Sequence, residues 1–554
     1  MNIYHNIEDF VQQFTSNDTV ALTAPLSVPE DSSMIIGYYN PARARGSIHL
    51  RNIQPHAWKE LYTGKYFLLA VHGLKRIREL YQLRDLDVQC DRVIDSRLMA
   101  HLLDPGKDED HGYNLNKLGY KYRDDYPIMT GDLFALDYPD FLYQSLSHDA
   151  EMIYRLAESL NAEMDADLCR LYKEEEFPVA SVLVQMHLDG IQVDQGGCQQ
   201  ALEQAQDELQ VLEAEIALTR KCNLFSDKDV YWLFHNREIE LPEGIGDYYR
   251  LDEDDLEELA SDHDSALAEQ ILRWRQLTRD LTFLQAGAQT DRVHPVWRLT
   301  RTSTGRITAS NPPVQNLDKK RFRHFLIPAD GCVLIKADWK ACQARILAHL
   351  SKDPALLQLF NEGQDFHAVT AQMFGLANRE EAKPINFGMI FGQGPRELAR
   401  EVNKSWKEQG LDKEIDQIQA ASMIRTFFGK YSGIEPYFDQ MYEELVAGQK
   451  LEKTLRNPLT GRIRRFHVRK SDKLKRIMKA TLLQQVESHL LKLALIRLHA
   501  ELKARSMGAR IVMAIHDALW VECLKEEAEQ VRQLLRKMMT TADKFKVPLE
   551  VEIG

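Results

Sequence analysis

The sequence predicts a multidomain α/β protein, with an N-terminal α/β domain, a long helical segment and a second domain that mixes strands and helices. The chain has 554 residues, which is too long for one hydrophobic core, so three or four domains are expected. Strand-like runs and helical stretches alternate up to about residue 165. Two amphipathic stripes follow, and strand-like runs return after about residue 300.

The first domain is expected over residues 1–170. Short apolar runs come first and are then mixed with helical patterns, which is typical of an α/β domain. The candidate strands are Thr19–Leu22, Met34–Tyr39, Ser47–Leu50 and Tyr66–Val71, and the candidate helices are Leu74–Gln82, Ser96–Leu103, Leu115–Leu118 and Asp149–Leu160.

A helical arm is expected over residues 171–300. Apolar residues follow a helical spacing from Leu202 to Ile216, and a second stripe runs from Leu267 to Leu284. Two helices of this length would form an antiparallel hairpin about 30 Å long. Beyond it, strands are expected in residues 301–360 and 451–554, and residues 361–450 have an almost entirely helical pattern.

Composition excludes several classes of protein. Hydrophobic residues make up 44% and charged residues 28%, as in ordinary globular proteins. No apolar run reaches the roughly 18 residues of a membrane span, and the N-terminus does not resemble a secretion signal. The seven cysteines form no C-x-x-C pair. We therefore expect a reduced, cytoplasmic protein with no membrane partner and no structural zinc.

The charge is unevenly distributed. The net charge is −13, yet residues 450–479 contain twelve Lys or Arg and two acids. Residues 251–264, in contrast, contain eight acids and no base. A basic surface on an acidic body suits a protein that binds the phosphates of nucleic acid, although charge runs alone are more often solvated faces.

Two aspartates suggest metal chemistry. Asp338 lies in VLIKADWKACQARILAHL and Asp517 in IVMAIHDALW, both strand-like and apolar. Two such carboxylates could hold a pair of divalent ions. Between them, Arg379, Lys383 and Phe387 recur every four residues, and Phe391 extends the series. They share one helical face, which offers cations for phosphates and aromatic rings for a flat base. The sequence thus predicts nucleotidyl transfer.

Two further segments carry polar side chains suited to nucleotides and DNA. His367, twelve residues before Arg379, could add a donor to the triphosphate site. The loop TSTGRITASNPPVQNL contains Arg306, Gln315 and Asn316. Such side chains can reach the acceptor atoms of a DNA minor groove without reading its sequence.

The segments TSTGRITASNPPVQNL, ADWKACQARILAHL, REEAKPINFGMIFG and IHDALWVEC occur in the order of the family A DNA polymerases, which the chain resembles. The resemblance implies an RNase H-like domain of the 3′–5′ exonuclease type, followed by a right-hand polymerase. The thumb would span residues 171–300, the palm 301–360 and 451–554, and the fingers 361–450. It also implies primer–template DNA and dNTPs as partners, two Mg²⁺ ions that Mn²⁺ can replace, and a monomer.

The resemblance implies a role for each matching position. Asp338, Asp517 and the backbone carbonyl of Trp339 would bind the metals, and Lys383 would also donate a proton to pyrophosphate. Residues expected to contact the nucleotide are Arg379, Lys383, His367, Phe387, Phe391, Gln343 and Trp339. Residues expected to contact DNA are Arg306, Gln315, Asn316, Arg476, Gln484 and His516.

The sequence departs from the family at the side chain that lies beneath the sugar C2′ and excludes a 2′-hydroxyl by its bulk. We call this side chain the gate. The family usually has Glu five residues after the first aspartate, hydrogen-bonded to a Tyr eight residues after the lysine. Here these positions are Gln343 and Phe391, and Ala518 replaces the acid that usually follows Asp517. Because Phe391 has no hydroxyl, we expect a looser gate and modestly more ribonucleotide insertion, unless Gln343 has another partner.

The N-terminal domain departs further. The carboxylates that an exonuclease of this kind needs are replaced at Thr23, Pro25 and Ile77, and Ser145 replaces a Tyr. Only Asp149 remains, so an inactive remnant without proofreading is expected. Residue 1 falls near the start of this domain, so no 5′-nuclease domain is expected. The unusual DWKACQAR motif favours a phage or mobile-element source.

Two alternatives stay open. A single-subunit RNA polymerase would share the palm and the Arg–Lys helix, but it should have a small residue at position 343 and Tyr at 391. A catalytically silent accessory protein would have had no reason to retain Asp338, Asp517 and Lys383.

Overall fold

The computed structural model describes most of the chain and divides it into two compact units. The described residues are 2–4, 10–15, 17–23, 34–42, 44–50, 61, 68–73, 92–106, 112–122, 138–216, 222–242, 245–246, 249–263, 265–318, 320–447, 452–467, 471–542 and 545–554. The first unit comprises Met1–Asp189, Trp297–Thr308 and Ile335–Gly554. The second comprises Gly190–Val296 and Ala309–Leu334.

The N-terminal part of the first unit is a six-stranded sheet of order β1-β4-β3-β2-β5-β6. Strand β3 is antiparallel to both of its neighbours, whereas β2, β5 and β6 run parallel. The strands are β1 (Asn2–Tyr4), β2 (Thr19–Leu22), β3 (Met34–Asn40), β4 (Ala44–Leu50), β5 (Leu68–Val71) and β6 (Val93–Asp95). The helices are α4 (Ser96–Leu103), α6 (Leu115–Tyr122) and α7 (Tyr138–Glu163).

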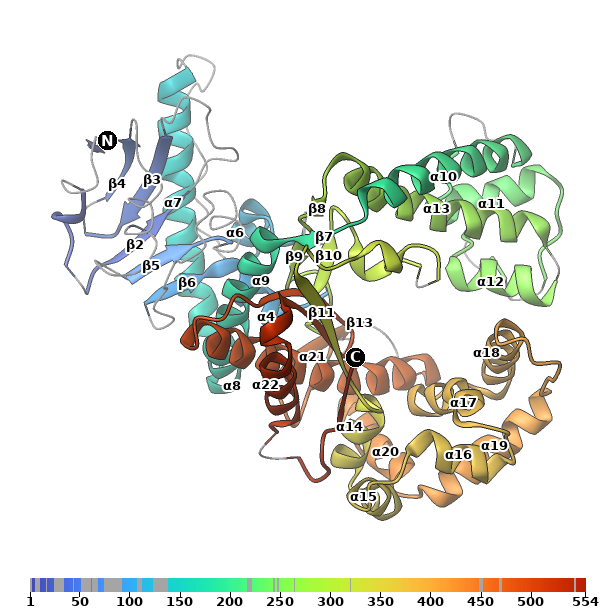
Figure 1. The fold of residues 1–554 in the computed structure, drawn as a ribbon. Coiled ribbons are helices and arrows are strands. Elements are labelled where there is room, and N and C mark those ends of the chain that lie inside the picture. The colour runs from blue at the N-terminus through green and yellow to red at the C-terminus, as the bar shows by residue number, and fades with distance from the viewer. Residues whose placement is uncertain are drawn as a thin grey trace. The chain divides into compact units, whose positions relative to one another are not determined.

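Helix α7 lies against this sheet, as Figure 1 shows. Ala21 and Ala70 of the sheet pack on Ala150, Ile153 and Ala157 of the helix, and the small alanine side chains allow close approach. The expected strands are confirmed to within a few residues. Helix Ser96–Leu103 is confirmed at both ends, and the expected helix from Asp149 to Leu160 is part of the longer α7. The expected helix Leu74–Gln82 lies outside the described residues.

The second unit is built on the two long helices that the apolar stripes predicted. Helix α10 (Gln195–Glu215) and helix α13 (Ala266–Gln289) run antiparallel. Gln195 Nε2 donates to the Ala288 carbonyl at 2.9 Å near one end, and Arg273 Nε bonds Glu208 Oε1 at 2.5 Å nearer the other. The hairpin is therefore confirmed, although the unit begins at Gly190 rather than at residue 171.

Two short helices between the long ones were not expected. Helices α11 (Asp227–Asn236) and α12 (Glu253–Asp262) bury Phe234 and Leu256 against Ile271 of α13. The Ser226 hydroxyl caps α11, and Asp252 forms a capping box with Asp255. These caps are readable in the sequence. The remaining elements are β7 (Ile191–Gln192), β8 (Arg292–Val293), η4 (Val314–Asn316) and η5 (Arg323–Phe325).

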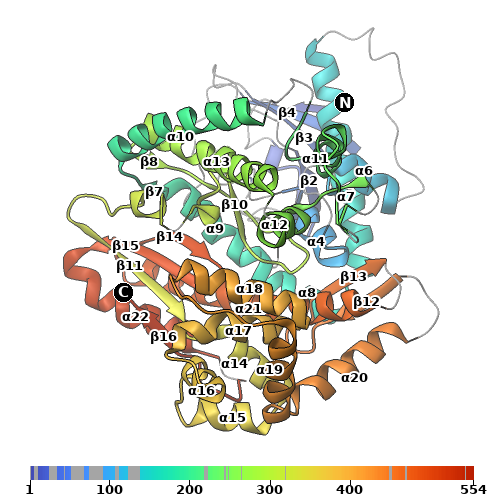
Figure 2. The ribbon, with the colours of Figure 1, turned by 90° about the vertical axis from the view of Figure 1, so that its right-hand side faces the viewer.

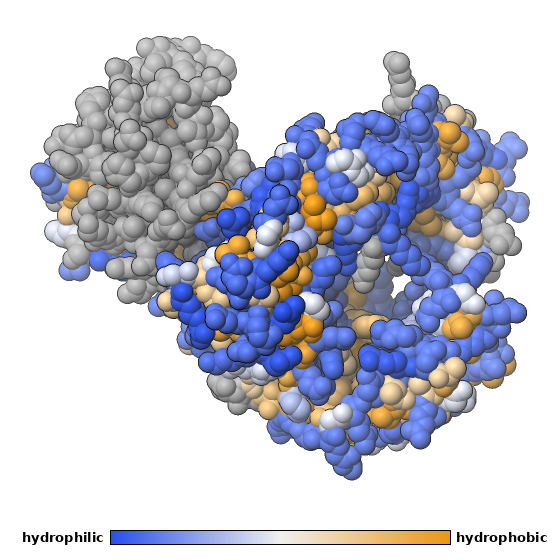
Figure 3. Space-filling model, in the orientation of Figure 1, coloured by the Kyte–Doolittle hydropathy of each residue, from blue (hydrophilic) through white to orange (hydrophobic). Residues whose placement is uncertain are grey.

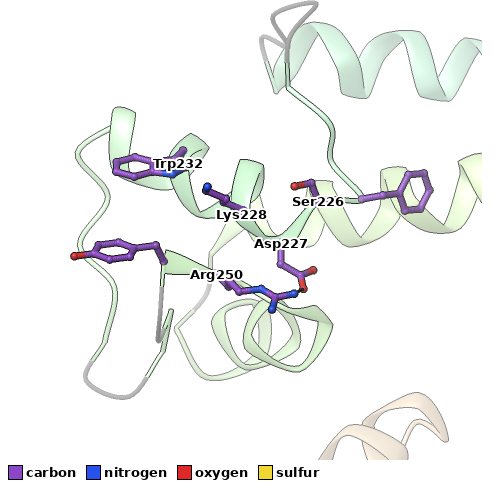
Figure 4. A pocket seen from close by; sticks show the side chains of 7 residues that line it. Ser226, Asp227, Lys228, Trp232 and Arg250 are labelled. Carbon is purple, nitrogen blue, oxygen red and sulfur yellow. Dashed lines mark hydrogen bonds and ion pairs between the residues drawn. The ribbon is translucent and has the colours of Figure 1, made fainter. Parts of the chain in front are cut away.

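Helix α11 lines a pocket of about 660 Å³ in the second unit, shown in Figure 4. Its Trp232 ring stacks on Tyr249 with the ring centroids 6.1 Å apart, and Arg250 forms an ion pair with Asp227. The pocket contains no pair of carboxylates and none of the predicted site residues. It is therefore separate from the chemistry described below.

The centre of the first unit is a four-stranded sheet of order β14-β15-β11-β16. Its strands are β11 (Cys332–Trp339), β14 (Arg510–Ile515), β15 (Ala518–Leu524) and β16 (Val551–Ile553), seen together in Figure 2. Helix α21 (Asp472–Ala504) is largely buried through apolar residues such as Leu483, Val486 and Leu495. The chain passes between the units at β9 (Val296–Arg298), β10 (Thr308–Ser310) and β11.

The rest of the first unit is mainly helical, as expected for residues 361–450. The remaining helices are α8 (Ala166–Leu171), η2 (Tyr172–Glu176), α9 (Phe177–Asp189), α14 (Cys342–Ser351), α15 (Pro354–Asn361), α16 (Phe366–Phe374), α17 (Arg379–Phe391), α18 (Pro395–Glu408), α19 (Gln417–Lys430), α20 (Ile434–Val446), η6 (Lys525–Glu527) and α22 (Ala528–Thr540). Strands β12 (Glu452–Arg456) and β13 (Ile463–His467) form an antiparallel hairpin.

None of the described helices combines the length and the hydropathy that crossing a membrane requires. The face over α10 and over α17–α18 is mainly hydrophilic in Figure 3. The six cysteines in the described part of the chain are free thiols.

Candidate active site

The two predicted aspartates meet at the central sheet. Asp338 is exposed on β11, and Asp517 is half-buried in the turn between β14 and β15, the strand next to β11. The backbone N–H of Trp339 donates to the Asp517 carbonyl at 3.4 Å, which joins the two segments. The expectation that both acids lie on strands was wrong for Asp517. A hairpin turn carries it, and the preceding His516 has a positive φ of 53°.

The electrostatics of this pair favour a cation. Burial, followed by the neighbouring carboxylates of Asp338 and Glu487, raises the pKa of Asp517 to about 8. Carboxylates that repel one another in this way are stabilised in their charged form by a divalent ion. Within the described residues no third His, Cys, Asp or Glu completes a ligand cluster. A metal here would therefore need oxygen ligands from the backbone, substrate or water.

Trp339 is held firmly in place. Its ring is buried, and its Nε1 atom donates to the Met539 carbonyl at 2.7 Å. The ring therefore serves as packing, and only the backbone of Trp339 remains as a candidate metal ligand. Oxygen donors of this kind are the ligands that Mg²⁺ prefers.

Helix α17 presents the predicted basic and aromatic stripe. Asn378 caps its start by accepting from the N–H groups of Glu380 and Glu381. Lys383, Phe387 and Phe391 line one pocket of about 570 Å³, and Phe387 is 48% exposed. An exposed ring beside an ammonium group in a pocket suits a nucleotide better than it suits a folded core. Arg379 does not line this pocket, although it begins the same helix.

Both cations of the stripe have local acidic partners. Lys383 Nζ lies 2.5 Å from Glu380 Oε2, and Arg379 Nη1 lies 3.1 Å from Asp365 Oδ2. All four side chains are more than a third exposed, so these pairs are weak and exchangeable. A triphosphate could replace the carboxylates as the partner of both cations.

His367 on α16 lies next to this stripe as a neutral side chain. Burial, and to a lesser extent Lys383 and Arg379, lowers its pKa to about 4 against the opposing effect of Asp365. Asn386 Nδ2 lies 2.9 Å from His367 Nδ1, while Asn386 Oδ1 accepts from Thr370. Asn386 therefore donates to Nδ1, which leaves the imidazole proton on Nε2. His367 can donate a hydrogen bond, but it adds no charge near pH 7.

The predicted DNA-contacting residues are spread over several elements. Gln315 and Asn316 lie in the second unit, where Gln315 Oε1 accepts from the Ala309 N–H at 2.8 Å. Gln484 is half-buried on α21, and His516 is exposed in the turn before Asp517. Arg476 Nη1 forms an exposed pair with Glu397 at 2.8 Å.

Arg306 and Gln343 share one partner that the sequence did not reveal. Gln343 Nε2 donates to Glu487 Oε2 at 2.7 Å, and Arg306 Nη2 donates to Glu487 Oε1 at 2.6 Å. Glu487 lies on α21 and is 1% exposed. Its signal in the sequence was an acid three residues beyond Gln484, on the apolar face of a long helix. Gln343 therefore has another partner, which is the case in which the sequence predicted no loosening of this side chain. The effect on ribonucleotide insertion stays a prediction.

The basic stretch of residues 450–479 is less available than its composition suggested. Arg462 is buried against Glu175 and Glu176, and Lys479 is buried against the rings of Phe428 and Phe438. Further described members form ion pairs with acids of the same unit: Arg456 with Asp165, Arg465 with Glu452, Lys475 with Asp439 and Arg476 with Glu397. Only part of this stretch can contact phosphate.

In the described part of the N-terminal domain, Thr23 and Asp149 are the two expected exonuclease positions whose side chains can be placed. Thr23 is buried, and its hydroxyl donates to the Leu146 carbonyl at 3.2 Å. The Asp149 side chain is 40% exposed, and its Oδ1 atom lies 3.8 Å from His148 Nδ1. Pro25 and Ile77 lie outside the described residues, and so does the side chain of Ser145.

Comparison with known proteins agrees with this geometry. Residues 195–554 match the model of DNA polymerase family A. DNA polymerase I of Caldicellulosiruptor bescii is 30% identical over 73% of this chain and 49% of its own length. DNA polymerase I of Borreliella burgdorferi is 27% identical over 93% of this chain and 58% of its own length. The thermostable DNA polymerase I of Thermus aquaticus is 29% identical over 83% of this chain and 54% of its own length. The chain thus spans about half the length of these relatives.

A solved structure extends the comparison to the fold. The POL domain of Pol1 from M. smegmatis, in complex with DNA primer-template and dNTP, superimposes with a TM-score of 0.76 at 22% identity. The match covers 100% of this chain and 98% of that one. At this identity the match establishes the fold alone. Together with the family model, which covers more than half of the chain, it leads to one conclusion: this chain belongs to DNA polymerase family A.

Proposed function

We propose that the chain is a template-directed DNA polymerase that adds dNTPs to the 3′ end of a DNA primer. The observation that carries this proposal is the convergence of Asp338 and Asp517 at one end of the four-stranded sheet of a family A fold. The pocket of Lys383, Phe387 and Phe391 supports it, because it combines a cation with exposed rings. In this proposal α10–α13 form the thumb, the four-stranded sheet the palm and α16–α19 the fingers.

The reaction would form a bond between the primer 3′-oxygen and the α-phosphorus of the dNTP and break the bond to pyrophosphate. Two Mg²⁺ ions, held by Asp338, Asp517 and the Trp339 carbonyl, would supply charge neutralisation and a lowered pKa of the 3′-hydroxyl. Lys383 would exchange Glu380 for the phosphates and donate a proton to the leaving pyrophosphate. Arg379 would bind phosphate as a cation, and His367 as a neutral donor from Nε2.

The aromatic residues and the polar loop would position the substrates. Phe387 would pack on the incoming base, with Phe391 behind it in the same pocket. Gln315, Asn316, Gln484 and His516 would contact the primer–template in its minor groove, and Arg476 would contact its phosphates. Arg306 is committed to Glu487, so we assign it to the support of the site rather than to the groove.

The N-terminal sheet would be an RNase H-like domain of the exonuclease type without catalytic activity. Its strand order, with β3 antiparallel between β4 and β2, supports the assignment of the fold. The buried Thr23 supports the loss of the site, because a hydroxyl committed to a carbonyl cannot replace a metal-binding carboxylate. The chain would work as a monomer in the cytoplasm.

The test is primer extension by the purified protein with Mg²⁺, each dNTP and each rNTP, on templates of known sequence. Incorporation of the dNTP complementary to the template, lost in Asp338→Ala, is the expected result. Glu529→Gln, at an exposed position near the start of α22, provides the matched control. Incorporation of rNTPs at equal rate would favour an RNA polymerase. No incorporation at all would favour a silent accessory protein and would refute the proposal.

A further inference from the structure

The most unusual group near the candidate active site is the carboxylate of Glu487. Among the described residues, buried acids are few, and Glu487 at 1% exposure is one of them. It contributes to the raised pKa of both Asp517 and the buried Cys342 thiol, which places its charge near the site. Burying a carboxylate is costly unless hydrogen bonds compensate it, so its partners define its role.

Both oxygens of Glu487 are occupied. Oε2 accepts from Gln343 Nε2 at 2.7 Å, and Oε1 accepts from Arg306 Nη2 at 2.6 Å. Hydrogen bonds to a charged group are about twice as strong as neutral ones. The neighbouring Ser488 hydroxyl also donates to the Gly305 carbonyl at 2.6 Å. Through Glu487 and Ser488, helix α21 is thus hydrogen-bonded both to the loop before β10 and to the first turn of α14.

The bond fixes more than the position of Gln343. A carboxylate can only accept, so it holds the amide nitrogen of Gln343 toward α21 and prevents the amide from turning over. The amide oxygen Oε1 is buried, and no residue in the described part of the chain bonds it. Gln343 is therefore locked in one rotamer with one polar atom uncommitted, five residues after Asp338.

We propose that Glu487 is a positioning residue that sets sugar selection by holding Gln343 in a single orientation beside the incoming nucleotide. This inference rests on the proposed polymerase function. The family usually has a charged Glu at position 343, whereas this chain has the neutral Gln343. Glu487 on α21 therefore supplies the negative charge beside the gate. Its bond to Gln343 replaces the restraint that a hydroxyl at position 391 would have provided.

The proposal predicts a specific pattern of kinetic changes. With Glu487→Gln, an amide nitrogen must face either Gln343 or Arg306, so the lock on Gln343 is weakened. The ratio of dNTP to rNTP insertion, measured as kcat/KM, should fall by roughly ten- to a hundredfold, the factor expected from one hydrogen bond to a charged group. The change should appear mainly in KM, because Glu487 does not touch the reacting atoms.

The exchange of the two side chains gives the sharpest test. Gln343→Glu alone brings two carboxylates into hydrogen-bond range, and it should reduce dNTP insertion more than Glu487→Gln does. In the double variant Gln343→Glu with Glu487→Gln, the new amide can accept from Arg306 and donate to the new carboxylate. The bond between positions 343 and 487 is then restored with donor and acceptor exchanged, and Arg306 still donates to position 487, so selectivity should return to within a few fold of the natural protein.

Single-nucleotide insertion of dNTP and rNTP by all four proteins, with thermal melting to verify folding, measures these outcomes. Glu501→Gln on the same helix is the matched control, because Glu501 pairs with Arg505 at 3.0 Å on an exposed surface. An unchanged ratio in Glu487→Gln, or no recovery in the exchange variant, would overturn the inference. Failure of the natural protein to extend a primer would instead overturn the proposed function. If Glu487→Gln does not fold, the exchange variant and Gln343→Glu decide the question.

Discussion

The backbone N–H of Trp339 donates to the carbonyl of Asp517 at 3.4 Å, so the strand that carries Asp338 is joined to the turn that carries Asp517. Burial of Asp517, followed by repulsion from the carboxylates of Asp338 and Glu487, raises the pKa of Asp517 to about 8. In the metal-free protein Asp517 therefore keeps its proton near neutral pH, and this can be measured in two ways.

The first prediction concerns the stability of the metal-free protein. An unfolded Asp loses its proton near pH 4, whereas folded Asp517 keeps it up to about pH 8. The folded state thus binds more protons in this window, and the contribution of Asp517 to stability falls as pH rises from about 4 to 8. Urea unfolding in EDTA at several pH values should show a shallower fall for Asp517→Asn. An identical slope in both proteins would contradict the assignment.

The second prediction concerns metal binding. Because Mg²⁺ must displace the proton of Asp517, its affinity should weaken as pH falls below about 8, with nearly one proton released at pH 7. Calorimetry in buffers of different ionisation enthalpy measures this release. Asp517→Asn should release almost none, and a release that is unchanged in this variant would argue against Asp517 as the titrating ligand.

The third prediction concerns His367, whose pKa is lowered to about 4 mainly by burial. The imidazole should stay neutral between pH 5 and 8, so the KM for dNTP should show no transition near pH 6.5. Asn386→Ala removes the donor that fixes the tautomer and should raise this KM severalfold. Titration of the ring by NMR is the direct check, and a pKa near 6.5 would contradict the prediction that the imidazole stays neutral from pH 5 to 8.

The sequence was a good guide where local pattern decides the structure. Helix α4, the pair α10 and α13, and the stripe on α17 follow from apolar spacing and caps. It was a poor guide where partners come from distant segments. Glu487 meets Gln343 and Arg306 across more than 140 residues, and Arg462 finds its acids on η2. The basic composition of residues 450–479 says nothing about which side chains are already paired.

The fourth prediction concerns the stability of that buried cluster. Arg462 and Lys492 share Glu175 and Glu176, and all four are at most 1% exposed. Removing one cation leaves a buried carboxylate uncompensated, so Arg462→Met should cost about 3–5 kcal/mol of unfolding free energy. The matched control is Arg465→Gln, three residues further along on β13. Arg465 forms a partly exposed pair with Glu452, so this change should cost less than about 1 kcal/mol. Equal losses in both would contradict the argument.

The last prediction is that the N-terminal domain does not remove mismatched primer ends. Where the resemblance to the exonuclease domain calls for a carboxylate, the chain has Thr23, which is buried and donates to the Leu146 carbonyl. A primer with a mismatched 3′ nucleotide should therefore stay intact with Mg²⁺ or Mn²⁺ in the absence of dNTPs. Asp149→Ala should behave identically, because one exposed carboxylate cannot assemble a metal site. A proofreading polymerase run in parallel verifies the assay. Shortening of the primer by the natural protein, abolished by Asp149→Ala, would show that Asp149 belongs to a working nuclease site.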